Sequence, residues 1–195
     1  MFFRLAVAPA FALVLAACVS APAAPQPSAF ETAITPLCGK AFEGRIVTAD
    51  AQDDDWRVQR VVMHVRGCAP GALQIPLHVG DNHSRTWLLT ERAEGWELRH
   101  DHRHEDGSED TLTQYGGFAS TPADALRQEF PADQSTKDLF DRENIPVSKT
   151  NVWAVEVDPS TNLFAYELRR PQRFLRVEFD TSTPVETPPT PWGWE

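Results

Sequence analysis

Between residues 41 and 180 the chain is a succession of short segments in which apolar residues alternate with polar ones. Glycine, proline, aspartate and asparagine residues, which favour turns, stand between the segments. The segments cover 41–48, 58–66, 73–79, 84–89, 96–104, 109–115, 151–157, 163–169 and 174–180. Such regular spacing is typical of antiparallel all-β folds. We therefore expect a mainly β fold, an antiparallel up-and-down barrel or sandwich of about eight or nine strands.

One short helix is expected at residues 133–144, with the sequence DQSTKDLFDREN. Asp133 or Ser135 can cap its N-terminus, and Ile145-Pro146 ends it. A single helix on eight or nine meandering strands resembles the calycin barrels, such as lipocalins, in architecture. The resemblance implies a fold and no particular activity.

The first residues of the chain have the pattern of an export signal, with Arg4 before an apolar run at 5–17. The run is too short to be kept as a membrane span, so residues 1–17 are predicted to be a signal peptide. It leads into the sequence LAAC, which ends at Cys18 and resembles the lipobox of bacterial lipoproteins. That resemblance implies that Cys18 is lipidated and begins the mature chain. Cleavage after the APA sequence at 21–23 is the alternative and would discard Cys18.

The residue after this cysteine is Val19 rather than aspartate, which in enteric lipoproteins implies export to the outer membrane. We therefore expect a lipid-anchored protein in the cell envelope of a Gram-negative bacterium, on the periplasmic side of the outer membrane. Secretion to the periplasm is the alternative. Because the net charge is −10, electrostatics favours neither nucleic acid nor an anionic membrane face as a partner. The expected membrane contact is through the lipid anchor.

Two proline-rich segments flank the strand-rich part of the chain. Residues 18–36 are predicted to be a Pro/Ala-rich tether that does not pack. Residues 182–195 are predicted to be a Pro-rich C-terminal tail, in which Trp192 and Trp194 are side chains able to dock. Residues 37–181 between them suffice for a single domain with its own core.

Cys38 and Cys68 are the cysteines that remain besides Cys18. They are predicted to form a disulfide, because exported proteins enter a compartment where disulfides persist. An antiparallel pairing of the first two predicted strands that places Phe42 opposite His64 also places Cys38 opposite Cys68. The bridge would then join the open end of that hairpin.

Three of the six histidines, His100, His102 and His104, occupy alternate positions of the predicted strand 96–104. Alternate residues of a strand share a face, and this face begins with Trp96. The opposite face carries charged residues, which are Glu97, Arg99, Asp101 and Arg103. We therefore expect the histidines to face a core or cavity and the charged residues to face water.

The Asp106-Gly107 pair is a strong signal for a two-residue hairpin turn. The turn sets a register that pairs His104 with Glu109, His102 with Thr111, His100 with Thr113, and Leu98 with Tyr115. The inner face is then unusually polar, and buried polar groups are costly without partners. We therefore predict a wet cavity or ligand-binding face composed of His100, His102, His104, Thr111, Thr113 and Tyr115.

A metal site on this strand is a second interpretation of the same residues. Two histidines separated by one residue can converge on one ion, and His102, His104 and Glu109 together offer two imidazoles and a carboxylate. A divalent metal is therefore a possible cofactor. The alternative is a hydrogen-bonded polar lining, in which His104 and Glu109 are simply paired near the end of a hairpin.

The sequence contains none of the G-x-S-x-G, phosphate-loop, G-x-G-x-x-G or H-E-x-x-H patterns. No catalytic residue is assigned, and enzymatic activity is left open. The stretches HDHRHEDGSED, TQYGG, EFPAD, RENIPVSKTNVW and FLRVEFD are similar to those of an uncharacterised group of proteobacterial secreted proteins. This resemblance spans residues 37–180 and implies export and a single domain, but no chemistry.

Three classes of function follow from these patterns. The first is a lipid-anchored binding module that holds an unknown small ligand on its histidine-lined face. The second is a metal-dependent enzyme that uses the histidine strand. The third is a structural or assembly lipoprotein of the envelope that acts through its surface.

Overall fold

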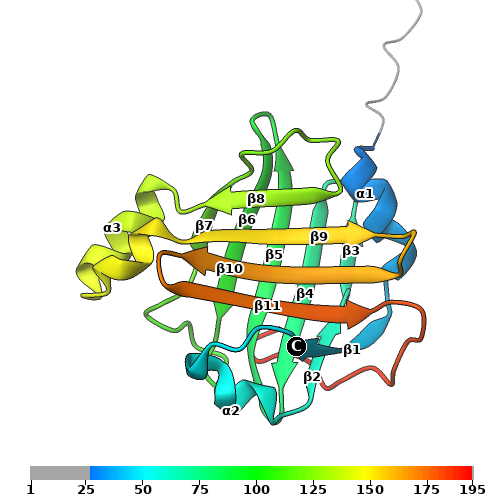
Figure 1. Ribbon diagram of the computed structural model, residues 1–195, viewed down its shortest axis with the longest axis horizontal. Coiled ribbons are helices and arrows are strands. Elements are labelled where there is room, and N and C mark those ends of the chain that lie inside the picture. The colour runs from blue at the N-terminus through cyan, green and yellow to red at the C-terminus, as the bar shows by residue number, and fades with distance from the viewer. Residues whose placement is uncertain (1–26, 195) are drawn as a thin grey trace, which may run out of the picture.

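Ten antiparallel strands curve into a nearly closed barrel in the computed structural model, which describes residues 27–194 (Figure 1). In order around the barrel the strands are β7 (Tyr115–Phe118), β6 (Gly95–His102), β5 (Asn82–Arg92), β4 (Ala72–Val79), β2 (Val61–His64), β1 (Ala41–Ile46), β11 (Arg173–Asp180), β10 (Leu163–Arg170), β9 (Val152–Asp158) and β8 (Arg127–Pro131). A short strand, β3 (Gly67–Ala69), pairs with β4 outside this path. Neighbouring strands are thus consecutive along the chain, except where β4 pairs with β2, with β3 between them in sequence, and where β1 pairs with β11.

The barrel closes between β7 and β8, which approach each other without forming a continuous ladder. The amide of Ser120 donates to the carbonyl of Glu129 at 2.8 Å, and the amide of Asp133 donates to the carbonyl of Gly116 at 3.1 Å. Gly117 makes this approach sterically possible, because a Cβ there would lie 2.0 Å from the carbonyl oxygen of Pro131.

The prediction of a mainly β, antiparallel fold is confirmed, and the sheet forms a barrel rather than a sandwich. Its architecture is compatible with that of calycins. The barrel has ten strands rather than eight or nine, because the sequence pattern does not predict β8, and it places the strand before β8 too early, at 109–115 instead of at β7. That strand contains one large apolar side chain, Phe130, and ends in proline, so its alternation is too weak to recognise.

Three helices accompany the barrel: α1 (Ala29–Ile34), α2 (Asp54–Arg57) and α3 (Gln134–Arg142). The expected helix is α3, and the carboxylate of Asp133 caps it by accepting from the amide of Thr136 at 2.8 Å. Short 3-10 helices occur at η1 (Thr35–Leu37), η2 (Ala51–Asp53) and η3 (Pro146–Thr150). No helix within residues 27–194 is long and apolar enough to cross a membrane.

Helix α1 covers one end of the barrel, so the interpretation of residues 18–36 as an unpacked tether is wrong for the part that the structure describes, residues 27–36. Phe30 and Ile34 are completely buried, and the ring of Phe30 packs edge-on against Trp96 with centroids 5.4 Å apart. These two residues are four apart, so they lie on the same face of the helix. The packed domain therefore begins before residue 37. Cys18 and the predicted signal peptide lie outside the described residues.

The interior of the barrel changes from apolar to polar along its axis. On β4, β5 and β6 the successive rows of inward side chains, from the end covered by α1, are Leu73–Leu89–Leu98, Ile75–Trp87–His100 and Leu77–Arg85–His102. The first row is aliphatic, the second contains an indole and an imidazole, and the third contains a guanidinium. The end away from α1 is therefore the polar end of the barrel.

The predicted disulfide between Cys38 and Cys68 is confirmed, with Cα atoms 6.1 Å apart. It closes a sequence separation of 30 residues, which in the chain-entropy account contributes about 3–4 kcal/mol to stability. The predicted register of the adjacent strands is wrong by one residue, because Ala41 rather than Phe42 faces His64. In the observed register Phe42 faces Met63, so two core side chains share the inner face.

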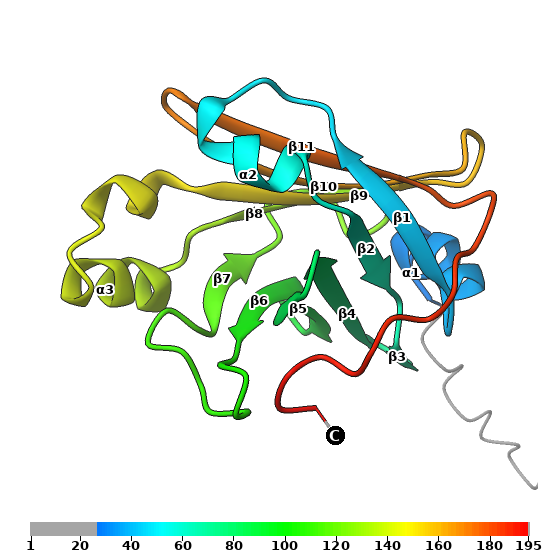
Figure 2. The ribbon, with the colours of Figure 1, turned by 90° about the horizontal axis from the view of Figure 1, so that it is seen from below.

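The C-terminal tail, residues 182–194, lies along the outside of the barrel (Figure 2). The amide of Val185 donates to the carbonyl of Ala41 at 2.8 Å, and the indole of Trp194 donates to the carboxylate of Asp101 at 2.8 Å. Asp101 was predicted to face water, but it is completely buried. Gln114 also donates to this carboxylate, at 2.6 Å. Asp101 is thus buried by segments outside its own strand, which the alternation of residues within that strand cannot reveal.

Candidate functional site

The polar end of the barrel contains a cavity of about 420 Å³, which we call the open-end cavity. Strands β4, β5, β6, β7, β9, β10 and β11 supply its walls, and η2, α2, α3 and η3 surround its mouth. Its lining residues are Gln52, Asp53, Trp56, Leu77, Arg85, Trp87, His100, His102, Asp110, Leu112, Tyr115, Phe140, Ile145, Ser148, Asn151, Trp153, Tyr166, Leu168, Arg170, Arg173 and Leu175.

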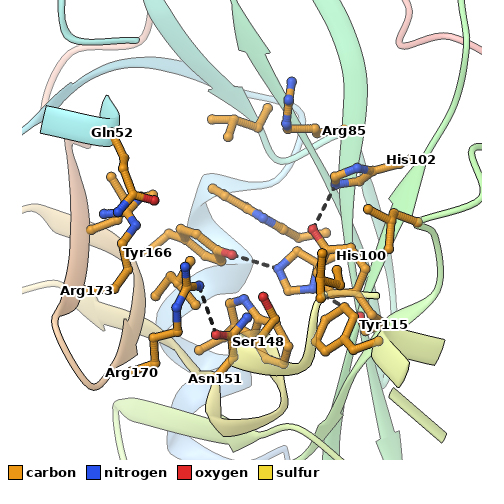
Figure 3. A pocket seen from close by; sticks show the side chains of 18 of the residues that line it. Gln52, Arg85, His100, His102, Tyr115, Ser148, Asn151, Tyr166, Arg170 and Arg173 are labelled. Atoms are coloured by element: carbon orange, nitrogen blue, oxygen red, sulfur yellow. Dashed lines mark hydrogen bonds between the residues drawn. The ribbon is translucent and has the colours of Figure 1, made fainter. Parts of the chain in front are cut away.

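His100 lies deep in this cavity and is 2% exposed. Its Nδ1 is 3.1 Å from the backbone oxygen of Tyr115, and its Nε2 is 2.7 Å from the hydroxyl of Tyr166 (Figure 3). A carbonyl oxygen can only accept, so Nδ1 carries the proton and Nε2 accepts from the Tyr166 hydroxyl. Burial, with the neighbouring His102, lowers the pKa of His100 to about 3. His100 is therefore a neutral imidazole with both nitrogens satisfied.

Tyr115 and His102 form a second hydrogen-bonded pair, with the hydroxyl 3.2 Å from Nε2 of the imidazole. Burial, together with the nearby charge of Arg85, lowers the pKa of His102 to about 4, and burial raises the pKa of Tyr115. Both groups are therefore neutral at pH 7, so they share one O–H and one N–H. Their mutual bond uses one of these protons. Within residues 27–194 no side chain or backbone group accepts the other proton.

Arg85 lies directly opposite His102 in the pairing of β5 with β6. One nitrogen of its guanidinium, Nη1, donates to Asn82 Oδ1 at 2.9 Å and to Ser84 Oγ at 3.1 Å. The guanidinium carbon also lies 4.7 Å from the ring centre of Trp56, a cation–π distance. Arg85 forms no ion pair with any residue that the structure describes. Burial lowers its pKa.

Two further arginines lie across the cavity from Arg85 (Figure 3). Arg173 forms a double ion pair with Asp53, at 2.5 and 2.7 Å, so this charge is neutralised within the protein. Arg170 donates to the amide oxygen of Asn151 at 3.2 Å. Burial and the adjacent charge of Arg173 lower the pKa of Arg170.

The deeper wall of the cavity is aromatic. The rings of Trp87 and Tyr166 stack with centroids 4.2 Å apart and planes inclined by 17°. Tyr115 lies against His100 at 4.6 Å and against Trp153 at 5.5 Å. These contacts hold the rings in fixed orientations, and the rings contribute apolar surface to the lining of the cavity.

The structure separates the residues of the predicted ligand-binding face. His100, His102 and Tyr115 line the cavity, whereas His104 and Thr111 are exposed and outside it. Thr113 does not line the cavity, and its hydroxyl accepts from the backbone amide of His102 at 2.8 Å. The expected inward direction therefore holds for the first two histidines and fails at the third.

The third histidine fails because β6 ends at His102, so the alternation of faces does not extend to His104. The predicted hairpin register is also wrong by two residues at β7, where Tyr115 faces His100 rather than Leu98. Apart from a bridge between Arg103 and Glu109, residues 109–114 of the predicted strand 109–115 form a loop that leads into β7. The carboxylate of Asp106 accepts from the amide of Ser108, and that of Asp110 accepts from the amide of Leu112; both bonds stabilise turns there. These local bonds compete with strand pairing.

The predicted metal ligands are not brought together. His102 lies in the cavity, His104 is exposed, and Glu109 forms an ion pair with Arg103 at 3.2 Å. Within residues 27–194 no group of three histidine, cysteine, aspartate or glutamate side chains is arranged to hold a metal ion. The donor set of the metal interpretation therefore does not fit this structure.

Several cavity residues are absent from the predicted site, above all Arg85, Trp87, Trp153, Tyr166 and Arg170. A usable signal existed for the first two, because Arg85 shares its strand face with Trp87 and Leu89. The remaining three come from strands that only the closure of the barrel brings opposite the histidines.

Comparisons with known proteins give no relative from which to assign this site: no protein-family model, no curated protein and no solved structure matches the chain.

Proposed function

We propose that this protein is an exported binding module that holds a small organic ligand in the open-end cavity. The observation that supports the proposal is the cavity itself. Its volume of about 420 Å³ lies in the range of small-molecule sites, roughly 300–1,000 Å³. Its apolar, aromatic walls and its few converging polar groups have the composition of such sites.

Filling the cavity should abolish binding of an aromatic probe. Ser148 is half-buried on η3 and lines the cavity, so Ser148→Trp would project an indole into the space. We expect N-phenyl-1-naphthylamine, a neutral fluorescent probe, to bind the unmodified protein and to bind Ser148→Trp at least tenfold more weakly in a fluorescence titration. Ser160→Trp is the matched control, because Ser160 is exposed in the turn between β9 and β10. Absence of probe binding, or equal loss in both variants, would contradict the proposal.

We further propose that the module is anchored by a lipid at Cys18 in a bacterial envelope. Pro27, the first described residue, lies beside α1 and therefore at the end of the barrel opposite the cavity. An anchor nine residues before it would hold the covered end nearest the membrane, so the cavity would open away from the lipid. This geometry leaves the mouth accessible to a diffusing ligand.

Cys18→Ser should prevent lipidation and remove the protein from the membrane fraction. The thioether that carries the lipid needs the cysteine sulfur, and a serine hydroxyl does not replace it. The measurement is membrane fractionation of expressing cells together with metabolic labelling by an alkyne-tagged fatty acid. Membrane retention and labelling of the Cys18→Ser protein equal to those of the unmodified protein would refute the anchor.

A further inference from the structure

We infer that the ligand of the open-end cavity carries an acidic group that pairs with Arg85, and that its apolar body lies deeper, against Trp87. This inference rests on the proposed function and specifies the chemical class of the ligand, an organic anion. The support comes from the charges, the unused donors and the order of side chains along the barrel.

The lining of the cavity has the opposite electrostatic character to the chain as a whole. The chain has a net charge of −10, yet the cavity is lined by three arginines and only two aspartates. Asp53 is already paired with Arg173. The second carboxylate, Asp110, accepts from the amide of Leu112 and is near enough to act on Arg85 electrostatically, but it forms no ion pair with it. Among residues 27–194 the Arg85 guanidinium thus has no carboxylate in direct contact, at the position where a ligand would enter.

Several hydrogen-bond donors at the cavity have no partner within the described residues. The protein uses Nη1 of Arg85, whereas Nε and Nη2 have no partner among residues 27–194. The pair formed by Tyr115 and His102 retains one unused proton, whichever of the two groups donates in their mutual bond. A group with two acceptor oxygens matches this excess, and a carboxylate fits a guanidinium in a bidentate geometry. A ligand with only donors would leave these protons unsatisfied.

The order of side chains along the barrel gives the ligand its direction. Arg85 and His102 form the row nearest the mouth, and Trp87 and His100 form the next row inward. Below them the interior is aliphatic and closed by α1. A charged group at the mouth keeps part of its hydration, while an apolar body in the deeper row replaces water on the ring faces.

A pair of probes with the same body separates this inference from the function on which it rests. We would titrate the protein at pH 7 with 2-naphthoate and with 2-naphthamide, which differ in the charge of one substituent. Binding would be measured by isothermal titration calorimetry and by quenching of tryptophan fluorescence. We expect the acid to bind at least tenfold more tightly than the amide, and Arg85→Met to reduce that ratio to within threefold of one.

Arg66→Met is the matched control, because Arg66 is exposed near the disulfide at the covered end and its removal changes the net charge equally. It should leave the acid-to-amide ratio unchanged.

Equal binding of both probes by the unmodified protein would overturn the inference and leave the proposed function intact. Binding of neither probe would overturn both. An unchanged ratio in Arg85→Met, or an equal fall in Arg66→Met, would also overturn it. If Arg85→Met does not fold, the ratio in the unmodified protein still decides whether the cavity prefers an organic anion.

Discussion

Replacing Phe30 with alanine should lower the free energy of unfolding by about 3–5 kcal/mol, as removal of a fully buried phenylalanine does in well-packed cores. Phe30 is 0% exposed and contacts the ring of Trp96, so the truncation leaves a void at the covered end of the barrel. The helix that carries Phe30 has only six residues, and a helix this short depends on its buried face for stability. The measurement is urea denaturation followed by tryptophan fluorescence.

Phe174→Ala is the matched control, because the same side chain on β11 is 44% exposed. It should cost less than half as much as Phe30→Ala, since almost half of this side chain already faces water and its removal leaves no enclosed void. Equal unfolding midpoints for Phe30→Ala and the unmodified protein would show that α1 is not part of the cooperative domain. Residues 27–36 would then be a tether after all.

The features of this fold that local patterns determine could be predicted from the sequence. Most of the strands, the helix capped by Asp133 and the bridge between Cys38 and Cys68 each depend on residues close together or on a chemical rule. The alternation of apolar and polar residues also places His100 inside the barrel. None of these predictions requires knowledge of which distant segments meet.

The features that failed depend on competition between local and distant contacts. The Asp106-Gly107 pair does form a turn, but Asp110 stabilises a further turn and delays the next strand until Tyr115. Asp101 lies on a face that only the C-terminal tail covers, through Trp194. Strand periodicity reports which residues share a face, and it does not report what packs on that face.

The residues of the cavity likewise include some that the sequence could predict and some that it could not. Arg85 and Trp87 have inward parity in their own strand, so the sequence contains half of the site. The other half comes from β9 and β10, which supply Trp153, Tyr166 and Arg170. These two strands face the histidine strand, β6, only because the pairing of β1 with β11 curves the sheet into a barrel. That closure is a property of the whole sheet.

Acidification from pH 7 to pH 4 should destabilise the domain strongly, before its paired carboxylates titrate. Burial lowers the pKa of His100 to about 3 and the pKa values of His78 and His102 to about 4. In the unfolded chain these imidazoles have pKa values near 6.5. Between pH 6.5 and about 4 the unfolded chain therefore binds protons that the folded protein does not, and stability falls as the pH falls. Each histidine contributes a slope of up to roughly 1.4 kcal/mol per pH unit.

Carboxylates change the stability of the fold at lower pH than the histidines do. The hydrogen-bonded pair with Arg169 holds the pKa of Glu129 at about 2, so this group stabilises the fold above its unfolded pKa near 4.5. Its contribution is lost only as the pH falls from there toward 2. A loss of stability already present at pH 5 is thus attributable to the histidines. Melting temperatures measured by circular dichroism between pH 7 and pH 4 report it.

His78→Phe isolates one of these histidines. His78 is 3% exposed beneath the C-terminal tail, its ring packs against His83 at 4.7 Å, and neither of its ring nitrogens has a hydrogen-bond partner within residues 27–194. Phenylalanine therefore loses no hydrogen bond there, and it removes a group that the unfolded chain protonates. We expect the variant to be at least as stable as the unmodified protein at pH 7 and to lose less stability by pH 4.5.

His104→Phe is the control, because His104 is exposed, and the stability of this variant should vary with pH as that of the unmodified protein does. If the His78→Phe profile runs parallel to the unmodified one, the buried imidazole at position 78 is not a source of the acid sensitivity.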